Sequence, residues 1–325
     1  MAVADARGRV LAWAGEPDLH IFPRSAFKPF QALPLVESGA FARSGLGMDA
    51  LALIAGSHSG TDRHAALART ILAAAGVDES ALRCGSHPPY DEPTAAALAA
   101  RGEAPTPIRH NCSGKHAGML LMARFLGAPL ESYTDPAHPV QRNIFARFAE
   151  LVGEEFADAT PAIDGCSAPT PRMPVRTLAY AFALLVRGVD REGRDLPALA
   201  TIRDAMRAHP DLVAGEGRID TLLMKAVPGL VAKAGAEGVH ATGDPKRGIG
   251  IAVKIEDGSR RALGPAVTST LEALGVIGEV ERKALAKHAG ERIRNAAGID
   301  VGEIRGVARL EGLDAGRHTE PGGQG

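Results

Sequence analysis

The sequence contains little cysteine: Cys84, Cys112 and Cys166 are the only thiols among 325 residues. An odd number of cysteines at wide spacing is a poor disulfide framework and a normal count for a protein of a reducing compartment. We therefore expect these side chains to be free thiols or metal ligands. A small extracellular fold held together by disulfides is excluded.

Long hydrophobic runs and an excess of charge of either sign are missing as well. The formal net charge is −1, so the chain offers no basic field to attract phosphate backbones or anionic lipids. Its longest uncharged apolar run, TLAYAFALLV at 177–186, is about half as long as a membrane span and is typical of a buried helix. The opening MAVADARGRV has neither the basic start nor the apolar core of a secretion signal. We therefore expect a cytoplasmic protein with no nucleic-acid and no membrane partner.

Strand-like patterns lie near both ends of the chain, and helix-like patterns fill its middle. Alternating segments bounded by turn residues predict two short strands within 2–14, around a turn at Ala6-Arg7-Gly8, and further strands at 19–22, 230–241, 247–258 and 303–310. Apolar spacing and end signals predict helices at 25–38, 61–76, 113–127, 137–152, 174–187, 197–208, 217–227, 260–275 and 279–294.

This order of elements predicts an α+β fold rather than an alternating βαβ one. One antiparallel sheet is built from the N- and C-terminal segments, about residues 1–24 and 229–310, and is covered by helices. A large helical middle region spans about 25–228. Because no linker interrupts the chain, we expect a single domain at 1–315 and a disordered tail at 316–325.

A serine and a lysine stand three residues apart in RSAFKPFQ, at Ser25 and Lys28. Residues three apart on a helix share a face, so the lysine amine can reach the serine hydroxyl. An amine whose pKa is lowered by desolvation can accept the serine proton, which activates the hydroxyl as a nucleophile. A capping serine followed by a solvated lysine explains the same residues, so the pair needs further context.

Two later segments supply such context. Serine β-lactamases and penicillin-binding proteins follow S-x-x-K with a second serine motif and then with K-T-G on a late strand. This chain has Ser57 in AGSHSG and Lys233 in LVAKAGAEG, in that order. "KAG" departs from K-T-G, and "SHS" departs from the usual S-D-N. The order of the motifs nevertheless favours a serine hydrolase over an isolated cap.

A second polar group centres on RHNCSGKHAG at 109–118, with a distant partner in AIDGCSAP. If Ser113 caps the helix that follows, Cys112 lies just before its start and His116 lies in its first turn. Two functional interpretations compete: a nucleophile system of Cys112, His116 and Asp164, or a metal site that uses the thiolates of Cys112 and Cys166. The spacing matches no standard zinc pattern, and a purely structural helix start remains a third interpretation.

Six segments in unbroken order resemble the rhizobial-type L-asparaginases, the "asparaginase II" family. They are PRSAFKPFQAL, IAGSHSGTDRH, CGSHPPYDEP, IRHNCSGKHAGML, DGCSAPTPRMPV and LVAKAGAEGV. Relative to this family the chain starts late, because members usually begin with a segment containing Glu and His that leads into the strand equivalent to AVADARGRVLAW. In family members this segment forms an edge near the site. We therefore expect either that it precedes the printed start or that this protein lacks it.

The resemblance implies a fold similar to the serine β-lactamases and glutaminases, and a single catalytic domain. It implies hydrolysis of L-asparagine to L-aspartate and ammonia by two serine–lysine pairs, Ser25 with Lys28 and Ser57 with Lys233, through an acyl-enzyme. Which pair carries the nucleophile stays open, although Ser25 is favoured by its place at a helix start. A hydrolase of the same fold acting on glutamine or a peptidoglycan fragment, or a zinc-binding sensor without catalysis, are the alternatives.

The resemblance also implies a metal site and an assembly. One zinc ion, not strictly required for catalysis, would be held by Cys112, Lys115 and Cys166. His116 and Asp164 would bind the substrate close by. The family suggests a homodimer.

Overall fold

The computed structural model describes residues 1–153 and 161–312. Its strands are β1 Ala2–Asp5, β2 Val10–Trp13, β3 His20–Ile21, β4 Ala162–Ile163, β5 Pro169–Thr170, β6 Met173–Pro174, β7 Val231–Gly235, β8 Val239–Asp244, β9 Ile249–Lys254, β10 Gly290–Arg294 and β11 Asp300–Arg305. The α-helices are α1 Lys28–Gln31, α2 Leu33–Glu37, α3 Ala40–Arg43, α4 Met48–Ile54, α5 Asp62–Ala74, α6 Glu92–Ala100, α7 Ser113–Leu126, α8 Pro139–Val152, α9 Val175–Arg187, α10 Pro197–Ala208, α11 Pro210–Val213, α12 Ile219–Ala226, α13 Arg260–Ala273, α14 Glu279–Ala284 and α15 Ala286–Ala289. Short 3-10 helices are η1 Arg24–Phe27, η2 Glu79–Ala81 and η3 Pro107–Arg109.

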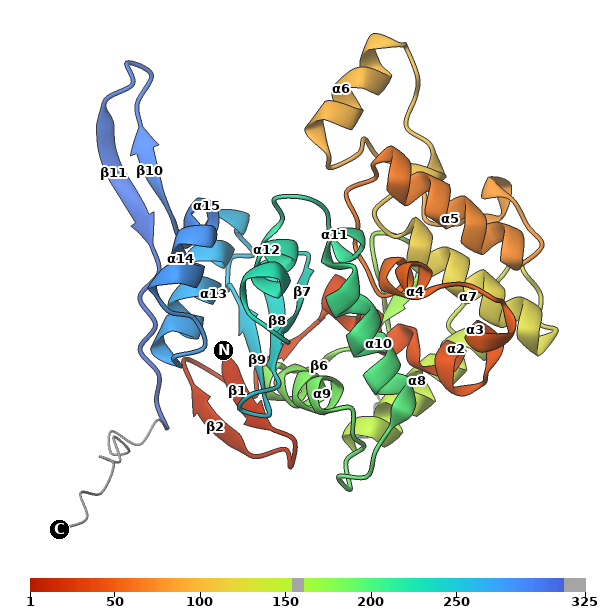
Figure 1. Ribbon diagram of the computed structural model, residues 1–325, viewed down its shortest axis with the longest axis horizontal. Helices are drawn as coiled ribbons and strands as arrows, with labels where there is room; N and C mark the ends of the chain where they lie inside the picture. Colours follow the sequence, from red (N-terminus) through yellow and green to blue (C-terminus); the bar gives the residue numbers. More distant parts are fainter. Residues whose placement is uncertain (154–160, 313–325) are drawn as a thin grey trace.

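The main sheet joins the two ends of the chain, as the sequence predicts. Its order is β2-β1-β9-β8-β7, and each neighbouring pair is antiparallel. The N-terminal strand β1 pairs with β9 in the register Val3 to Ile251. The α+β prediction is therefore confirmed: N- and C-terminal strands form one sheet, and helices fill the middle of the chain (Figure 1).

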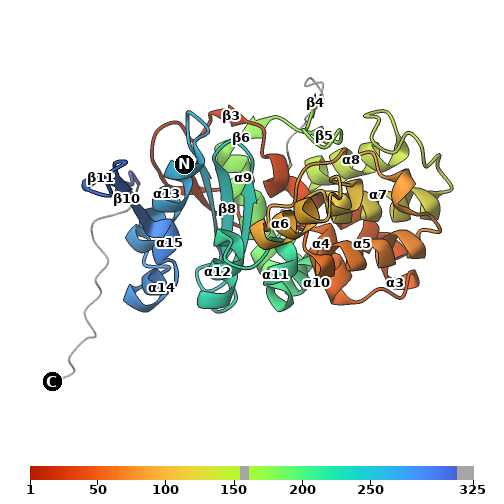
Figure 2. The same cartoon turned by 90° about the horizontal axis from the view of Figure 1, so that it is seen from above.

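Helices pack against this sheet from two sides, α9 on one and α13 on the other. Two glycines on the strands let α9 approach closely. A Cβ on Gly250 would lie 1.9 Å from the carbonyl oxygen of Ala179, and one on Gly243 would lie 2.8 Å from the Val186 side chain. Figure 2 shows the sheet standing between α13–α15 and the helical middle region. These glycines therefore set the spacing between sheet and helix.

The middle region is centred on α7, which packs against α4 and α5. Gly114 and Gly118 lie one turn apart on α7. A Cβ on Gly114 would lie 2.6 Å from Leu53 O, and one on Gly118 would lie 2.7 Å from the Ile54 side chain. The glycines of SGKHAG thus allow α7 to touch α4. No helix within residues 1–153 and 161–312 is both long and apolar enough to cross a bilayer.

The single helix predicted at 25–38 is wrong. The chain instead forms η1, α1 and α2 in succession. Pro29 and Pro34 stand in the first turns of α1 and α2, where the missing N–H of proline is tolerated. Because proline lacks the N–H that an interior helix position donates, Pro29 and Pro34 favour breaks in this segment, whereas α13 accommodates Pro265 in its interior.

The C-terminal predictions also need correction. The helix predicted at 279–294 ends at Ala289, and Gly290–Arg294 is strand β10. The strand predicted at 303–310 does not join the main sheet: β11 pairs with β10 in a hairpin that projects from the body (Figure 1). The main sheet meets this end of the chain only at the bridge between Trp13 and Glu311, within the described residues.

Several further segments differ from the predictions. Residues 230–241 were expected to be one strand, but Glu237 has φ +57° and turns the chain between β7 and β8. The strand predicted at 19–22 pairs with β6 outside the main sheet. Helices α3, α4, α6 and α11 were not predicted. The predicted disordered tail, 316–325, lies outside the described residues.

Candidate active site

Ser25 lies inside η1 and is 9% exposed. The expectation that it caps a helix is wrong, because Pro23 precedes η1 and no side-chain cap is formed. Its neighbour Arg24 has φ +52°, a strained value for a residue with a side chain. Arg24 is held by two ion pairs, Nε to Asp164 Oδ1 at 2.6 Å and a guanidinium nitrogen to Glu237 at 2.8 Å.

Strain is concentrated around this ion-pair network. Among the described residues, the non-glycine positions with positive φ are Arg24, Ser167 and Glu237. Ser167 closes a turn with Asp164: the backbone N–H of Ser167 donates to Asp164 O at 2.8 Å. Strained backbone of this kind persists where the surroundings enforce it, and it clusters at active sites. The segments that carry Ser25, Asp164 and the β7–β8 turn are thereby brought together.

Lys28 begins α1 and is 1% exposed. Its Nζ donates a hydrogen bond to Asn111 O at 3.2 Å. Burial lowers the pKa of Lys28, because a charged amine loses its hydration there. The side chain of the same Asn111 donates from Nδ2 to Ser57 Oγ at 2.8 Å. Asn111 therefore connects Lys28 with Ser57, a link that the sequence analysis missed although Asn111 stands in the quoted RHNCSGKHAG.

Ser57 is 5% exposed and follows α4. Its backbone N–H donates to Val213 O at 2.7 Å. The next residue, His58, is fully buried and forms a hydrogen bond between Nε2 and Ser113 Oγ at 3.0 Å. Because Gly60 N–H donates to His58 Nδ1, the proton of the ring lies on Nε2. Burial lowers the pKa of His58 well below its ordinary value, so this ring is neutral.

Lys233 lies on β7 and is completely buried. Its Nζ donates to the neighbouring Ala234 O at 2.7 Å and lies 3.5 Å from Asp220 Oδ2. Asp220, on α12, also accepts a hydrogen bond at Oδ1 from His240 Nε2 at 3.1 Å. We call Lys233, Asp220 and His240 the lysine–aspartate centre. The sequence analysis missed Asp220 and His240, for which no motif signal exists.

The lysine–aspartate centre adjoins the Ser25 segment. A Cβ on Gly235 would lie 2.5 Å from Pro23 O, so the glycine of "KAG" is required for β7 to touch η1. Burial lowers the pKa of Lys233 to about 8, although the Asp220 carboxylate acts in the opposite direction. The positive charge of Lys28 contributes to the same lowering, which shows that the two lysines share one region.

Cys112, Lys115, His116 and Cys166 form a second group, which we call the thiol centre. Lys115 Nζ donates to Cys166 Sγ at 3.0 Å. Cys112 donates a hydrogen bond to Cys166, and this bond lowers the pKa of Cys166 and raises the pKa of Cys112. The charge of Lys115 also helps to hold the pKa of Cys166 well below its ordinary value. Burial disfavours the Lys115 ammonium, but the charges of Cys166, Cys112 and Asp164 together outweigh burial and raise its pKa. The centre thus holds a thiol, a thiolate and an ammonium.

One atom of the thiol centre lacks a partner. His116 Nδ1 is hydrogen-bonded to Tyr133 Oη at 2.7 Å, whereas His116 Nε2 is buried with no hydrogen-bond partner of acceptable geometry. Burial lowers the pKa of His116, although the nearby Cys166 thiolate opposes this effect. Asp164, the other predicted substrate-binding residue, places Oδ2 4.0 Å from Cys166 Sγ and pairs with Arg24.

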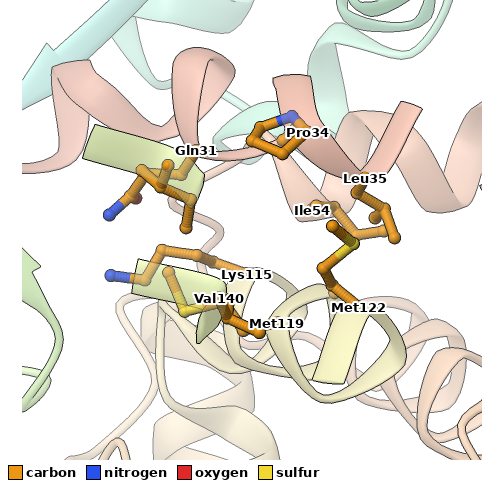
Figure 3. A pocket seen from close by; sticks show the side chains of 11 residues that line it. Gln31, Pro34, Leu35, Ile54, Lys115, Met119, Met122 and Val140 are labelled. Atoms are coloured by element: carbon orange, nitrogen blue, oxygen red, sulfur yellow. The ribbon is translucent and has the colours of Figure 1, made fainter. Parts of the chain in front are cut away.

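The stem of Lys115 borders a small apolar pocket between α1–α2 and α7, shown in Figure 3. The terminal nitrogens of Lys115 and Gln31 point to the same side of it, away from Leu35 and Met122. The aliphatic part of Lys115 is therefore surrounded by apolar side chains, and only its amine reaches the sulfur of Cys166.

The structure thus gathers the predicted residues in one region. The charge of Lys28 acts on Cys112, Lys115 and Cys166, and the charge of Lys233 is coupled to Lys28. The two predicted pairs differ from the expected geometry in one respect. Lys28 bonds to Asn111 O and to the Cys112 side chain, and Lys233 bonds to Ala234 O and to Asp220. Within the described residues, neither lysine is hydrogen-bonded to Ser25 or Ser57.

Comparison with protein families identifies the family of this chain. The family model of L-asparaginase II matches residues 1–306. The chain belongs to the L-asparaginase II family. No curated protein matches the sequence. Membership implies an amidohydrolase with L-asparaginase activity and L-asparagine as its substrate. The predicted family is therefore confirmed.

Proposed function

We propose that this L-asparaginase II family member hydrolyses the side-chain amide of L-asparagine through a serine–lysine acyl-enzyme. The observation that carries the proposal is a set of two buried amines that neighbouring residues link to the segments of two serines. Lys28 is joined through Asn111 to Ser57, and Lys233 lies on the strand that touches the Ser25 segment. Buried lysines of this kind can exchange protons near neutral pH.

Ser25 is the better candidate for the nucleophile. Ser57 Oγ already accepts a hydrogen bond from Asn111, and the backbone N–H of Ser57 donates to Val213 O. The backbone N–H of Ser57 is therefore not available to hold an oxyanion, and one lone pair of its hydroxyl is engaged, although its proton remains available for transfer. Ser25 follows the strained Arg24 and is the more exposed of the two serines. One backbone donor at the oxyanion contributes about 3 kcal/mol to transition-state stabilisation.

The proposed reaction has two balanced steps. Ser25 Oγ attacks the amide carbon while its proton passes to Lys28. The C–N bond then breaks, and the leaving nitrogen takes a proton from Lys233 by way of the Ser57 hydroxyl, which forms ammonia and an aspartyl ester. In the second step water attacks the ester and gives a proton to Lys233, while Lys28 returns its proton to Ser25.

We also propose a zinc site in the thiol centre. Two sulfurs and the nitrogen of Lys115 converge there, and the Cys166 thiolate interacts with the buried ring of His116. Sulfur and nitrogen donors suit zinc. Among the described residues, no three His, Cys, Asp or Glu side chains are arranged to hold a metal, so a site at Cys112 and Cys166 would need Lys115 as its third ligand. Binding would then release the protons of Lys115 and Cys112 to solvent. When bound, the ion would orient the α-amino and α-carboxylate groups of the substrate near Asp164.

Two substitutions test the nucleophile. We expect Ser25→Ala to reduce ammonia release from asparagine by at least a thousandfold. Ser57→Ala should retain acylation but slow it. Mass spectrometry of a rapidly quenched reaction should find the aspartyl ester on the peptide that carries Ser25. Full activity in Ser25→Ala would overturn the assignment, and an ester on Ser57 would reverse the roles of the two serines.

Substrate range and assembly are tested separately. Rates on asparagine, glutamine and nitrocefin should be highest for asparagine; a preference for either of the others would replace the proposed substrate. The family resemblance supports a homodimer. Light scattering at several protein concentrations should give twice the chain mass of 33.7 kDa.

A further inference from the structure

Asp220 is a buried carboxylate without a role in the reaction as proposed so far. It stands in the first turn of α12 and is 1% exposed. A buried carboxylate is costly unless its oxygens are matched by donors or charges. Here Oδ2 accepts the backbone N–H of Ala234 at 2.9 Å and faces Lys233 Nζ at 3.5 Å. Oδ2 of Asp220 therefore makes two contacts with β7, one with the backbone beside Lys233 and one with the Lys233 amine.

The other oxygen of Asp220 is held by His240. His240 Nε2 lies 3.1 Å from Asp220 Oδ1, and His240 Nδ1 lies 3.3 Å from the hydroxyl of Thr242. The hydroxyl can donate to Nδ1, which leaves the ring proton on Nε2 for the carboxylate. His240 and Thr242 project from the same face of β8, two residues apart. The carboxylate is thus fixed from two strands and one helix.

Several charges face Lys233. Burial favours the neutral amine of Lys233, and so do the positive charge of Arg218 and that of Lys28 whenever Lys28 is protonated. Asp220 is negative and favours the ammonium. Burial alone would favour the protonated carboxyl, but Lys233 and His240 outweigh it and lower the pKa of Asp220. The pair therefore carries opposite charges near neutral pH, inside a region that otherwise repels a second cation.

We propose that Asp220, oriented by His240, is a positioning residue that keeps Lys233 protonated and aimed until the leaving nitrogen needs a proton. The inference rests on the proposed function, because it deepens the role of Lys233 there. Asp220 does not touch the substrate; it acts through the lysine. The two lysines of the site then differ in charge because only Lys233 has a carboxylate against it.

The charge of Asp220 should set the pH dependence of the reaction. With Asp220 present, the pKa of Lys233 lies at about 8. An acid must be protonated to work, so kcat should fall as the pH rises through this value. Loss of the Asp220 charge removes the effect that raises the pKa of Lys233. The alkaline limb of the kcat profile should then move to lower pH.

The test compares Asp220→Asn with Asp244→Asn. Like Asp220, Asp244 is a buried carboxylate. It lies on β8 and pairs with Arg247 rather than with Lys233. In Asp220→Asn we expect the alkaline limb to move down by at least one pH unit and kcat at pH 7 to fall tenfold or more, with KM changed less than threefold. Asp244→Asn should leave the limb in place. An unshifted limb in a folded Asp220→Asn protein would overturn the proposal.

A second pair of variants covers the case in which Asp220→Asn does not fold. His240→Gln keeps an N–H donor, and His240→Leu removes it while both charges remain. We expect kcat within threefold of the parent for His240→Gln and a three- to tenfold loss for His240→Leu. Equal activity of the two variants would overturn the role of His240.

Carbon-13 NMR of labelled lysine separates this inference from the proposed function. The Lys233 signal, assigned by its absence in Lys233→Arg, should titrate at lower pH in Asp220→Asn than in the parent. This readout needs no substrate. If the parent fails to hydrolyse asparagine but the shift is present, the proposed function fails and the charge linkage stands. If asparagine is hydrolysed and the Lys233 titration is unchanged, the linkage fails alone.

Discussion

The lysine–aspartate centre and the thiol centre lie side by side, and both bury charge, but they do so in different ways. In the first, Lys233 and Asp220 have hydrogen-bond partners from the protein. In the second, His116 Nε2 is left without one. Among the described residues, none of the buried polar atoms that lack a partner belongs to the lysine–aspartate centre.

This difference indicates different tasks. A buried charge pair whose donors and acceptors have partners within the protein is held in a fixed geometry, and it needs no bound ligand for its stability. A cluster of soft donors with an open atom is suited to a further ligand. The first centre is therefore expected to act by proton transfer and the second by binding. Substitutions in the two centres should therefore have different effects on catalysis, ligand binding and stability.

The largest effect should come from Lys233→Met. It removes the proposed acid and leaves Asp220 buried without its positive partner, so activity should fall by a thousandfold or more. The free energy of unfolding should drop by about 3 to 5 kcal/mol. Denaturant titration and ammonia release measure the two effects. The double variant Lys233→Met/Asp220→Asn should recover much of the stability and none of the activity; recovered activity would contradict the role of Lys233.

Cys166→Ser should affect binding more than chemistry. A serine hydroxyl is a poor zinc ligand, so we expect stoichiometric zinc to be lost. KM for asparagine should rise ten- to a hundredfold while kcat changes less than tenfold. Elemental analysis and steady-state kinetics provide the measurements. Cys84→Ser is the control, since burial raises the pKa of Cys84 to about 12 and it pairs with carbonyl oxygens. Zinc retained in Cys166→Ser would remove the metal site from the thiol centre.

Two glycines test how tightly each centre is packed. A Cβ at Gly235 would lie 2.5 Å from Pro23 O, whereas one at Gly165 would meet only the Arg24 side chain at 3.7 Å. Gly235→Ala should therefore cost about 2 to 3 kcal/mol and reduce activity. Gly165→Ala should stay within about 0.5 kcal/mol. Thermal unfolding of both variants gives the comparison, and equal costs would show that the two centres are equally close-packed.

The smallest effect concerns acid stability beside the thiol centre. Burial, together with His87 and Lys28, lowers the pKa of His110 to about 3. Because the unfolded ring takes up a proton below about pH 6.5 and the folded ring does not, stability is lost as the pH falls. The loss is about 2 kcal/mol for this residue at pH 5. His110→Asn should show a shallower dependence of unfolding on pH between 5 and 7. His20→Asn, at an exposed position, should not change it.

Much of the fold could be predicted from local pattern. The helices at Asp62–Ala74 and Ser113–Leu126 were recognised from their start and stop signals, a capping threonine at Thr61 and a left-handed Gly127. Predictions failed where a local pattern was ambiguous. Residues 290–294 continue a helix-like pattern, but pairing with β11 makes them a strand. Long-range pairing overrides propensity in such segments.

The site shows the same division. Ser25, Lys28 and Cys112 stand in motifs that can be recognised in the linear sequence. Asp220 and His240 stand in no motif, and they acquire a role only because α12 and β8 bring them against Lys233. Asn111 stood within a quoted motif, but its link between Lys28 and Ser57 depends on packing between segments far apart in the chain.

The sequence by itself determined the family, the α+β order of elements and the types of side chain available for catalysis, because these depend on local spacing and composition. Tertiary structure alone decided which lysine has a carboxylate beside it and which histidine has an open nitrogen. The physical reason is burial. The charge of a buried amine or thiol depends on the few groups within hydrogen-bonding distance, and those groups come from segments that the linear order does not place together.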